Sequence, residues 1–383
     1  MKEEEVVLRT HQFLKSKGLD KQPLARIYTD AHSTLLSYKE LQPFQRFTLN
    51  LGDFVLHPDL VGQLSDGESI FAIEAKGDSD LIKGLAQAEM YQSGFHQVFL
   101  AAEASAWGTS LPKFARRKNI GVIAVSDSVE IAYSPEARMP FRDTFQFISR
   151  QLETVIQISG QQTFQFNIPT HYLVWAIVLD ANISYELDSL VTRLGNYPIP
   201  KDWQSALRGA KKLGIVNIFG NRVEITSIGV AVKDVLSTTI SEWAEVHKRV
   251  GAKGCGIPLV QLKSQAAALL RLLLLQDPMV RLVIDGLRQF SNHSAHFADL
   301  ARVCDQLDHA RAPIFFLKPI SASLLTDHNG RILWERATGE DYRSRMFYQY
   351  KSILKHAGIL SDTSLGGSTA KSYDPTQDIW KLL

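Results

Sequence analysis

The sequence predicts an α/β domain with a mixed β-sheet flanked by helices, followed by mainly α-helical domains. Three observations support this fold class. Up to about residue 150, apolar strand-like runs alternate with amphipathic helical patterns. Beyond that point the apolar spacing is mostly helical, with only short paired strands. The length of 383 residues also exceeds one ordinary core and fits two or three domains, and the changes of pattern along the chain place them at 1–150, 151–252 and 253–383.

Local patterns predict the elements of the first domain. Val6, Val7 and Leu14 recur at helical spacing among charged residues and Gly18 follows them, which predicts a helix over 3–17. Pro58 cannot donate to a sheet ladder, so a strand over 47–56 should end there and residues 60–62 should form a bend. The proline-containing stretch 22–44 predicts only a short helix around 33–41. The remaining elements are strands at 70–76, 97–102, 121–125 and 128–133 and helices at 80–95 and 111–118.

The second half predicts helices and short hairpins. Three helical patterns, at 171–179, 185–194 and 201–213, precede two strands at 215–219 and 222–226 that are joined by Gly220 and Asn221. Three helices followed by a hairpin are typical of a winged-helix domain. Residues 251–258 resemble a linker. A second winged-helix-like unit is expected from helices at 264–276, 280–290, 297–307 and 343–356, with a wing at Gly366-Gly367 between 359–360 and 378–382; residues 310–340 fit no simple element.

Composition and charge exclude several classes of protein. Hydrophobic residues make up 45% and charged residues 21%, as in ordinary globular proteins, and the net charge of +2 neither requires nor excludes nucleic acid. The two cysteines, Cys255 and Cys304, lack metal-site or disulfide spacing. The acidic N-terminus is no secretion signal and the apolar run 266–275 is too short for a bilayer, so we expect a cytoplasmic protein without a membrane partner.

Two acids and a lysine lie at the ends of the predicted strands. Glu74 and Lys76 are two residues apart on one strand, so their side chains point to the same face. Asp59 follows Pro58 at the end of the preceding strand and can share a cation with Glu74 if the strands pair. Carboxylate oxygens, water and substrate phosphate are the ligands that Mg²⁺ prefers. Such a group suits phosphodiester hydrolysis, in which a nearby lysine orients water or stabilises developing charge.

Pro58-Asp59 followed by Glu74-Ala75-Lys76 resembles the motif of the PD-(D/E)XK, or restriction-endonuclease-like, nuclease superfamily over about residues 1–135. The resemblance implies that Asp59 and Glu74 bind Mg²⁺ or Mn²⁺ and that Lys76 is catalytic. It also implies an acid on the first helix, for which Glu5 is the candidate and Glu4 the next. Gln87 and Tyr91 match a Q-x-x-x-Y pattern of some branches and share one helix face. Asp53 is the alternative first acid.

Basic residues on three predicted helices are candidates for binding DNA. A positively charged helix can contact phosphates without sequence preference, and a winged helix adds contacts in the grooves. The alternative is that these helices only form solvated faces or a docking platform. The candidates are Arg116, Arg117 and Lys118 in the first domain, Arg208, Lys211 and Lys212 in the second, and Arg343 and Lys351 in the third.

The expected function is therefore that of a metal-dependent DNA endonuclease. Restriction or anti-phage defence is one setting, and the nuclease subunit of a recombination or transposition complex is another. A homodimer is expected if both strands of a duplex are cut, because two sites related by a twofold axis are then needed. The alternative from another class is a non-catalytic, winged-helix nucleic-acid-binding or regulatory protein. The sequence contains no Gly-rich phosphate loop and no Ser/His/Asp order that would favour other chemistry.

Overall fold

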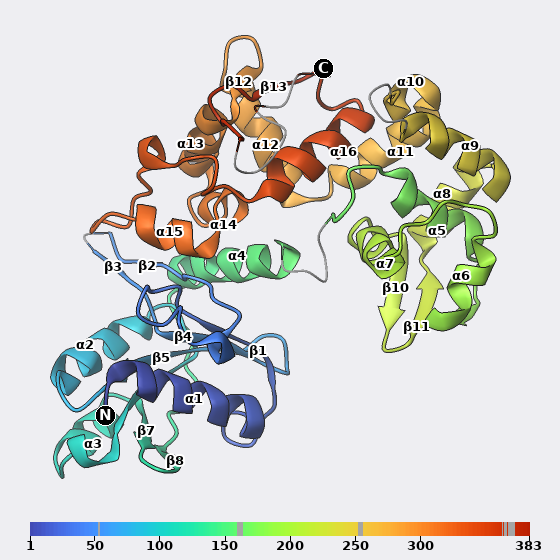
Figure 1. Ribbon diagram of the computed structural model, residues 1–383. Coiled ribbons are helices and arrows are strands. Elements are labelled where there is room, and N and C mark those ends of the chain that lie inside the picture. Colours follow the sequence, from blue (N-terminus) through green and yellow to red (C-terminus); the bar gives the residue numbers. More distant parts are fainter. Residues whose placement is uncertain (53, 159–163, 252–255, 362, 364–365, 367–371) are drawn as a thin grey trace. The chain divides into compact units, whose positions relative to one another are not determined.

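The computed structural model describes the chain except residues 53, 159–163, 252–255, 362, 364–365 and 367–371 (Figure 1). The chain divides into two compact units. The first unit contains Met1–Glu153 and Lys318–Arg336, and the second contains Thr154–Leu317 and Ala337–Leu383. The predicted boundary between 151–252 and 253–383 stays a prediction. Among the described residues, no helix combines the length and the apolar character that crossing a bilayer requires.

A mixed sheet of six strands forms the centre of the first unit. Its central strands β5, β6 and β7 are mutually parallel, while β1, β4 and β8 pair antiparallel with their neighbours. The predicted α/β class, with a mixed sheet flanked by helices, is therefore confirmed. In spatial order the strands are β1 (Leu24–Thr29), β4 (Leu60–Leu64), β5 (Ile70–Lys76), β6 (Gln97–Glu103), β7 (Gly121–Val125) and β8 (Val129–Tyr133).

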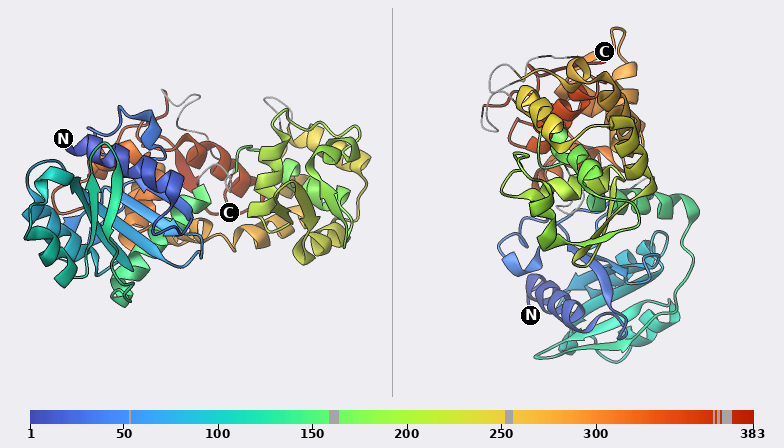
Figure 2. Two further views of the ribbon diagram at one scale, coloured as in Figure 1. Left: turned by 90° about the horizontal axis from the view of Figure 1, so that it is seen from below. Right: turned by 90° about the vertical axis from the view of Figure 1, so that its right-hand side faces the viewer.

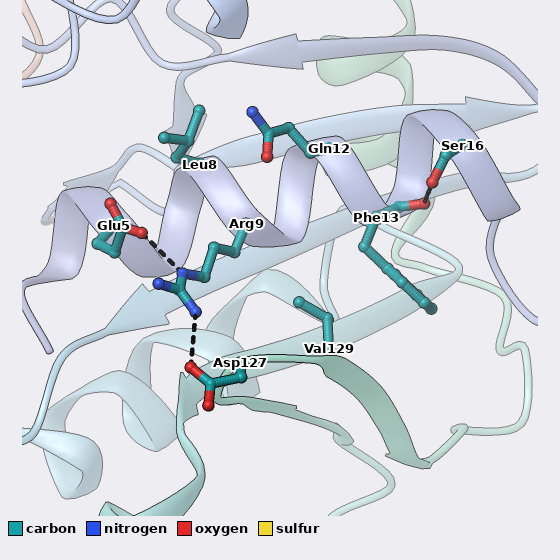
Figure 3. A pocket seen from close by; sticks show the side chains of 8 residues that line it. All are labelled: Glu5, Leu8, Arg9, Gln12, Phe13, Ser16, Asp127 and Val129. Atoms are coloured by element: carbon teal, nitrogen blue, oxygen red, sulfur yellow. Dashed lines mark hydrogen bonds and ion pairs between the residues drawn. The ribbon is translucent and has the colours of Figure 1, made fainter.

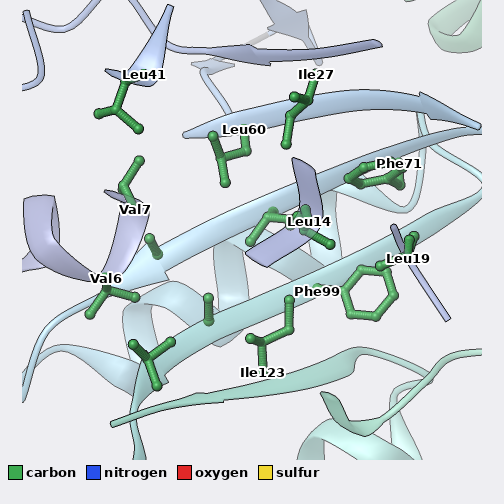
Figure 4. Packing of buried hydrophobic residues seen from close by; sticks show 14 of the residues in the cluster. Val6, Val7, Leu14, Leu19, Ile27, Leu41, Leu60, Phe71, Phe99 and Ile123 are labelled. Atoms are coloured by element: carbon green, nitrogen blue, oxygen red, sulfur yellow. The ribbon is translucent and has the colours of Figure 1, made fainter. Parts of the chain in front are cut away.

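Helix α1 (Glu3–Lys17) covers one face of this sheet (Figures 1 and 2). Its Val6, Val7 and Leu14 belong to one buried cluster with Phe71 and Ile73 of β5 (Figure 4). Burying such a side chain stabilises the fold by about 1.5–3 kcal/mol. Because alternate residues of a strand point to opposite faces, this packing directs Glu74 and Lys76 away from the α1 core.

Helix α2 (Leu81–Tyr91) packs against β5 and β6, and α3 (Leu111–Arg117) packs against β7. The close approach of α2 depends on Gly84, because a Cβ atom there would lie 2.7 Å from Lys76 Cγ. The unit also contains α4 (Arg142–Ile158) as far as Glu153, and the 3₁₀ turns η1 (Lys39–Leu41) and η2 (Ala104–Ala106). Helix α2 therefore meets the side of β5 that carries Lys76.

Three predictions near the first acid are wrong. Residues 47–56 form two short strands, β2 (Leu49–Asn50) and β3 (Val55–Leu56), which pair only with each other. Residues 60–62, predicted as a bend, begin the buried strand β4. Gly62 suggested a bend, but it makes room for the Phe71 ring, which a Cβ atom would approach to 2.1 Å. In the stretch 22–44 the structure forms β1, and only the last turn of the predicted helix exists, as η1.

A segment distant in sequence completes the first unit. Residues 318–336 comprise α15 (Pro319–Leu325), a turn closed by a bridge between Thr326 and Ile332, and η4 (Trp334–Arg336). Gly330 in this turn faces Val55 of β3, because a Cβ atom at Gly330 would lie 2.5 Å from Val55 Cγ1. The segment therefore supports the β2–β3 hairpin.

The second unit begins with helices and a three-stranded sheet. The predicted hairpin is present as β10 (Val216–Phe219) and β11 (Arg222–Ile225), and β11 also pairs with β9 (Ser184–Glu186). The predicted helix 185–194 is wrong at its start, because Tyr185 pairs with Val223 in this sheet. The helices of this part are α5 (Thr170–Val178), η3 (Leu187–Ser189), α6 (Leu190–Arg193), α7 (Trp203–Lys212), α8 (Ser227–Leu236) and α9 (Ile240–Val250).

The remainder of the second unit is helical, with one short strand pair. Strand β12 (Ser294–His296) pairs with β13 (Ile379–Lys381) near the end of the chain. Gly367 of the predicted wing lies outside the described residues, and the helix predicted at 343–356 is the π-helical turn η5 (Met346–Tyr350) followed by α16 (Lys351–His356). The other helices are α10 (Leu259–Leu262), α11 (Ser264–Leu274), α12 (Pro278–Arg288), α13 (Phe297–Leu307) and α14 (Ala312–Phe316).

Candidate active site

Strand register brings three acids to one end of the sheet. Thr29 of β1 pairs with Leu60 of β4, and Leu60 pairs with Ile73 of β5. Asp30 follows Thr29 and Glu74 follows Ile73, whereas Asp59 precedes Leu60 because β4 runs in the opposite direction. All three acids therefore lie at the same end of the sheet. The backbone N–H of Asp30 donates to the Asp59 carbonyl oxygen at 2.8 Å. The acids therefore lie beside one another because of strand pairing, and Asp59 stands at the start of β4 rather than at the end of a preceding strand.

Both predicted acids of the motif are held by hydrogen bonds. The backbone N–H of Ala75 donates to Asp59 Oδ2 at 2.7 Å. Glu74 is 2% exposed, and its Oε2 accepts a bond from the Tyr91 hydroxyl at 2.7 Å. Its Oε1 lies 2.8 Å from Lys76 Nζ. Helix α2 thus holds Glu74 through the hydroxyl of Tyr91.

Lys76 links the strand to the first helix. Its ammonium group donates to the Ala75 carbonyl at 2.9 Å and to Glu3 Oε2 at 3.2 Å. Burial opposes its positive charge, but Glu74 and Asp59 outweigh that effect and raise its pKa to about 12. Lys76 is therefore charged throughout the physiological pH range.

The surroundings of Asp59 and Glu74 disfavour the ionised form of both carboxyl groups. Burial raises the pKa of Asp59 well above its usual range, and the neighbouring Glu74 raises it further. Burial also raises the pKa of Glu74, although Lys76 partly offsets the effect. Two close carboxyl groups in a poorly hydrated place stabilise a proton or a cation between them. Their environment thus favours a bound positive charge.

These groups line a cavity of about 490 Å³ in the first unit. Val55 and Leu56 of β3 contribute apolar surface, and His57 lies beside them with its Nδ1 3.1 Å from the Phe47 carbonyl. The charged residues of the lining are Glu3, Glu4, Asp30, Asp59 and Glu74 together with Arg46 and Lys76. The lining of the cavity is therefore predominantly acidic.

The donor set fits a hard divalent cation. Asp59 and Glu74 supply carboxylate oxygens, and the buried Gln87 Oε1 of the same cavity has no hydrogen-bond partner in the part of the chain that is described. Over those same residues, no group of three or more His, Cys, Asp or Glu side chains is placed to hold a metal ion. Mg²⁺ is commonly bound by one or two carboxylates, with water and substrate phosphate as the other ligands, so two acids suffice.

The structure brings five predicted site residues to this cavity and leaves one elsewhere. Asp59, Glu74, Lys76 and Gln87 line it, and Tyr91 bonds Glu74 from behind. Glu5 instead accepts a bond from Arg9 Nε at 2.7 Å and lines a separate hollow of about 600 Å³ (Figure 3). Asp53, the alternative first acid, lies outside the described residues.

Two acids of α1 line the cavity: Glu4, which was the second predicted candidate, and Glu3, which was not predicted and accepts a bond from Lys76 Nζ at 3.2 Å. Helical phase explains the exchange: Glu3 lies on the face of Val7, which also lines the cavity, whereas Glu5 lies on the face of Arg9 and Gln12 (Figure 3). The buried positions of the helix were a signal that could have identified Glu3 from the sequence. Asp30 and Arg46 had no such signal, because β1 was not predicted.

The basic residues predicted on α3 lie outside the cavity. Lys118 pairs with Glu89 at 2.7 Å, and the Arg116 guanidinium lies over the Tyr133 ring at 5.5 Å. Arg117 is exposed. These side chains are accessible, so a contact with phosphate further along a substrate stays a prediction.

Three predicted DNA contacts in the second half are engaged inside the second unit. Lys212 is 7% exposed and lies 2.9 Å from Asp277, and Lys351 is enclosed in an ion pair with Asp378. Arg343 donates from Nε to the Ile314 carbonyl at 2.9 Å, and burial lowers its pKa to about 10. A DNA contact would require Lys212 and Lys351 to give up ion pairs that are costly to separate, and Arg343 to give up a buried hydrogen bond, so we propose no such contact for these three.

Arg208 and Lys211 of α7 remain as half-buried basic residues. Arg208 donates to Ser205 Oγ and lies 3.9 Å from Asp202.

No protein-family model, curated protein or solved structure matched this chain. The functional assignment therefore depends on the residues of the cavity and their geometry.

Proposed function

We propose that the first unit is a metal-dependent nuclease of the PD-(D/E)XK type that hydrolyses phosphodiester bonds in DNA. The observation that carries the proposal is the grouping of Asp59, Glu74 and Lys76 in one cavity at the end of adjacent strands. Their raised pKa values, and the hydrogen bonds that hold the two acids, are expected of a site that binds a cation. Helix α1 and the strands and helices of the sheet follow the order α1, β1, β4, β5, α2, β6, α3, β7, and from β5 onward this is the strand–helix alternation expected from the sequence.

In this proposal Asp59 and Glu74 hold Mg²⁺ or Mn²⁺. When bound, such an ion polarises the scissile phosphate and lowers the pKa of a water molecule. Lys76, charged at all physiological pH values, donates hydrogen bonds to the attacking water or to the phosphoryl oxygens as negative charge develops. Tyr91 and the Ala75 N–H keep the two carboxylates oriented before the substrate arrives.

We further propose that residues 170–225 bind DNA or a partner subunit as a winged helix. Support comes from β9, which lies between α5 and α6 and pairs with β11 of the hairpin. Strand β9 thereby extends the hairpin that would serve as the wing to a three-stranded sheet. Arg208 and Lys211 are the basic residues of α7 that this role would use.

The nuclease proposal is tested by cleavage of supercoiled plasmid and of labelled single-stranded DNA with Mg²⁺, Mn²⁺ or EDTA. We expect metal-dependent cutting that falls at least about a hundredfold in Lys76→Ala, because a group that stabilises transition-state charge is lost. Lys83→Ala is the matched control, since Lys83 is an exposed lysine of the adjacent helix α2. DNA binding without cutting in either metal would favour the non-catalytic alternative and overturn the proposal.

A further inference from the structure

Arg46 lines the candidate site and was not among its predicted residues. Its Nε donates to Asp30 Oδ1 at 2.9 Å and its Nη2 to Asp30 Oδ2 at 2.7 Å. The two side chains are only 13% and 6% exposed. Such a bidentate pair fixes the plane of the guanidinium group. The backbone N–H of Asp30 in turn donates to the carbonyl oxygen of Asp59. Arg46 is therefore held, through Asp30, beside the residue that we propose as a metal ligand.

Part of this guanidinium group is still available. Asp30 engages Nε and Nη2, and none of the described residues accepts a hydrogen bond from Nη1. Arg46 belongs to the cavity lining, so its side chain borders the space that a substrate would occupy. A fixed guanidinium with unused N–H groups matches the geometry of a phosphate better than a flexible ammonium group does.

The lining of the cavity carries a net negative charge, which a polyanionic substrate has to overcome. Its lining contains five acids and only two basic side chains, Arg46 and Lys76, which gives a formal charge of −3 with neutral histidines. One divalent cation still leaves the lining negative. A polyanionic substrate therefore needs hydrogen-bond donors at this place, and Arg46 is the arginine that the described lining offers.

We propose that Arg46 binds a backbone phosphate of the nucleic acid beside the scissile bond and that Asp30 positions it. This inference rests on the proposed nuclease function and names the part of the substrate that the site recognises. A contact of this kind is independent of base sequence, since every nucleotide carries the same phosphate group. Arg46 thus fixes the position of the strand, while Lys76 acts at the reacting phosphate.

The experiment measures binding of a labelled 30-base-pair duplex to the full chain in Ca²⁺ at several salt concentrations, and its cleavage in Mg²⁺. We expect Arg46→Gln to bind about tenfold more weakly, since a charged hydrogen bond is lost. The slope of log Kd against log salt should fall by about one phosphate contact. KM should rise with little change in kcat. Arg26→Gln is the matched control, because Arg26 of β1 donates to the neutral Gln63 and lies outside the cavity lining.

A double variant separates phosphate binding from simple neutralisation of Asp30. If Arg46 only neutralises Asp30, Arg46→Gln combined with Asp30→Asn should regain wild-type affinity and salt slope, which would overturn the inference. If Arg46 contacts phosphate, the double variant stays weak, and Asp30→Asn alone shows an intermediate loss. Thermal unfolding checks that each variant is folded.

The outcomes also distinguish the two proposals. A wild type that cuts DNA while Arg46→Gln keeps its affinity and slope overturns the Arg46 inference alone. A wild type that binds DNA through Arg46 but never cuts overturns the nuclease proposal alone. A wild type that neither binds nor cuts overturns both.

Discussion

The carboxylate of Glu74 is held in place by two neighbours, Tyr91 and Lys76. The hydroxyl of Tyr91 holds one carboxylate oxygen and the ammonium group of Lys76 holds the other. Because Glu74 is almost fully enclosed, losing either partner leaves a buried oxygen unsatisfied. The orientation of this carboxylate therefore depends on Tyr91 as much as on the strand that carries it.

Tyr91→Phe tests this dependence, since it removes the hydroxyl and keeps the buried ring. We expect the free energy of unfolding to fall by about 1–2 kcal/mol and DNA cleavage to fall about tenfold or more. Tyr133→Phe is the control, because the Tyr133 hydroxyl donates to Asn119 at 3.2 Å outside the cavity. Chemical denaturation and cleavage rates measure both. Equal cleavage by the two variants would contradict a role for Tyr91 at the site.

His11 predicts a pH dependence of stability. It is fully buried in α1, and neither ring nitrogen has a hydrogen-bond partner among the described residues. Burial lowers its pKa from 6.5 to about 4. The unfolded chain therefore binds a proton below pH 6.5 that the folded chain excludes down to about pH 4. This contribution to the free energy of unfolding is complete above pH 6.5 and is lost as the pH falls towards 4.

Urea unfolding of wild type and His11→Leu at pH 7 and pH 4.5 measures this effect. We expect wild type to lose about 2 kcal/mol more than the variant over that interval, because the variant lacks the titrating group. An identical loss in both proteins would show that His11 does not exclude the proton.

At the residue scale, local spacing predicted which site residues share one face of a strand or helix. The pairing of strands decided which further residues reach the cavity. Glu74 and Lys76 share a strand face, and Gln87 and Tyr91 share a helix face, so sequence distance alone grouped each pair. Arg46 reaches the cavity through Asp30, which depends on a strand pairing that no local pattern reveals. Their chemical roles remain predictions.

At the element scale, the strands that are continuously apolar were predicted and the interrupted ones were not. The strand at 70–76 and the helix at 3–17 match β5 and α1. Strand β4 was missed because Gly62 is typical of a bend, although here it accommodates the Phe71 ring. Propensity is a weak guide where a neighbouring strand determines the need for a small residue.

The turn around Gly330 gives a prediction at this scale. Gly330 and Gly67 both have a φ of +77°, but only a Cβ atom at Gly330 would meet Val55, whereas Gly67 has nothing within 4 Å. Gly67→Ala should cost about 1 kcal/mol of stability through backbone strain alone. Gly330→Ala should cost more and should also change KM for DNA, because Val55 lines the cavity.

Thermal unfolding and steady-state cleavage compare the two glycine variants. Equal losses of stability with unchanged KM would mean that the segment 318–336 does not support the cavity wall. A larger loss of stability together with a changed KM, confined to Gly330→Ala, would show that this distant segment acts on the site through the β2–β3 hairpin.

At the scale of the whole molecule, the chain leaves the first unit at Glu153 and contributes to it again over 318–336. No pattern in the sequence indicated this return, because residues 310–340 fit no simple element and their place depends on tertiary packing. The α/β class of the first unit was predictable, since it follows from the order of strands and helices. The proposed active site also lies wholly within this first unit.

The most direct test of the nuclease proposal is cleavage of a labelled DNA duplex by the full chain, with Mg²⁺ added back after EDTA, for wild type and Asp59→Asn. Asp59→Asn keeps the shape of the side chain and removes a charged metal ligand. The proposal predicts that Mg²⁺ restores cutting by wild type and that the variant is at least about a hundredfold slower. Cutting that persists in EDTA, or an Asp59→Asn protein as active as wild type, would contradict it.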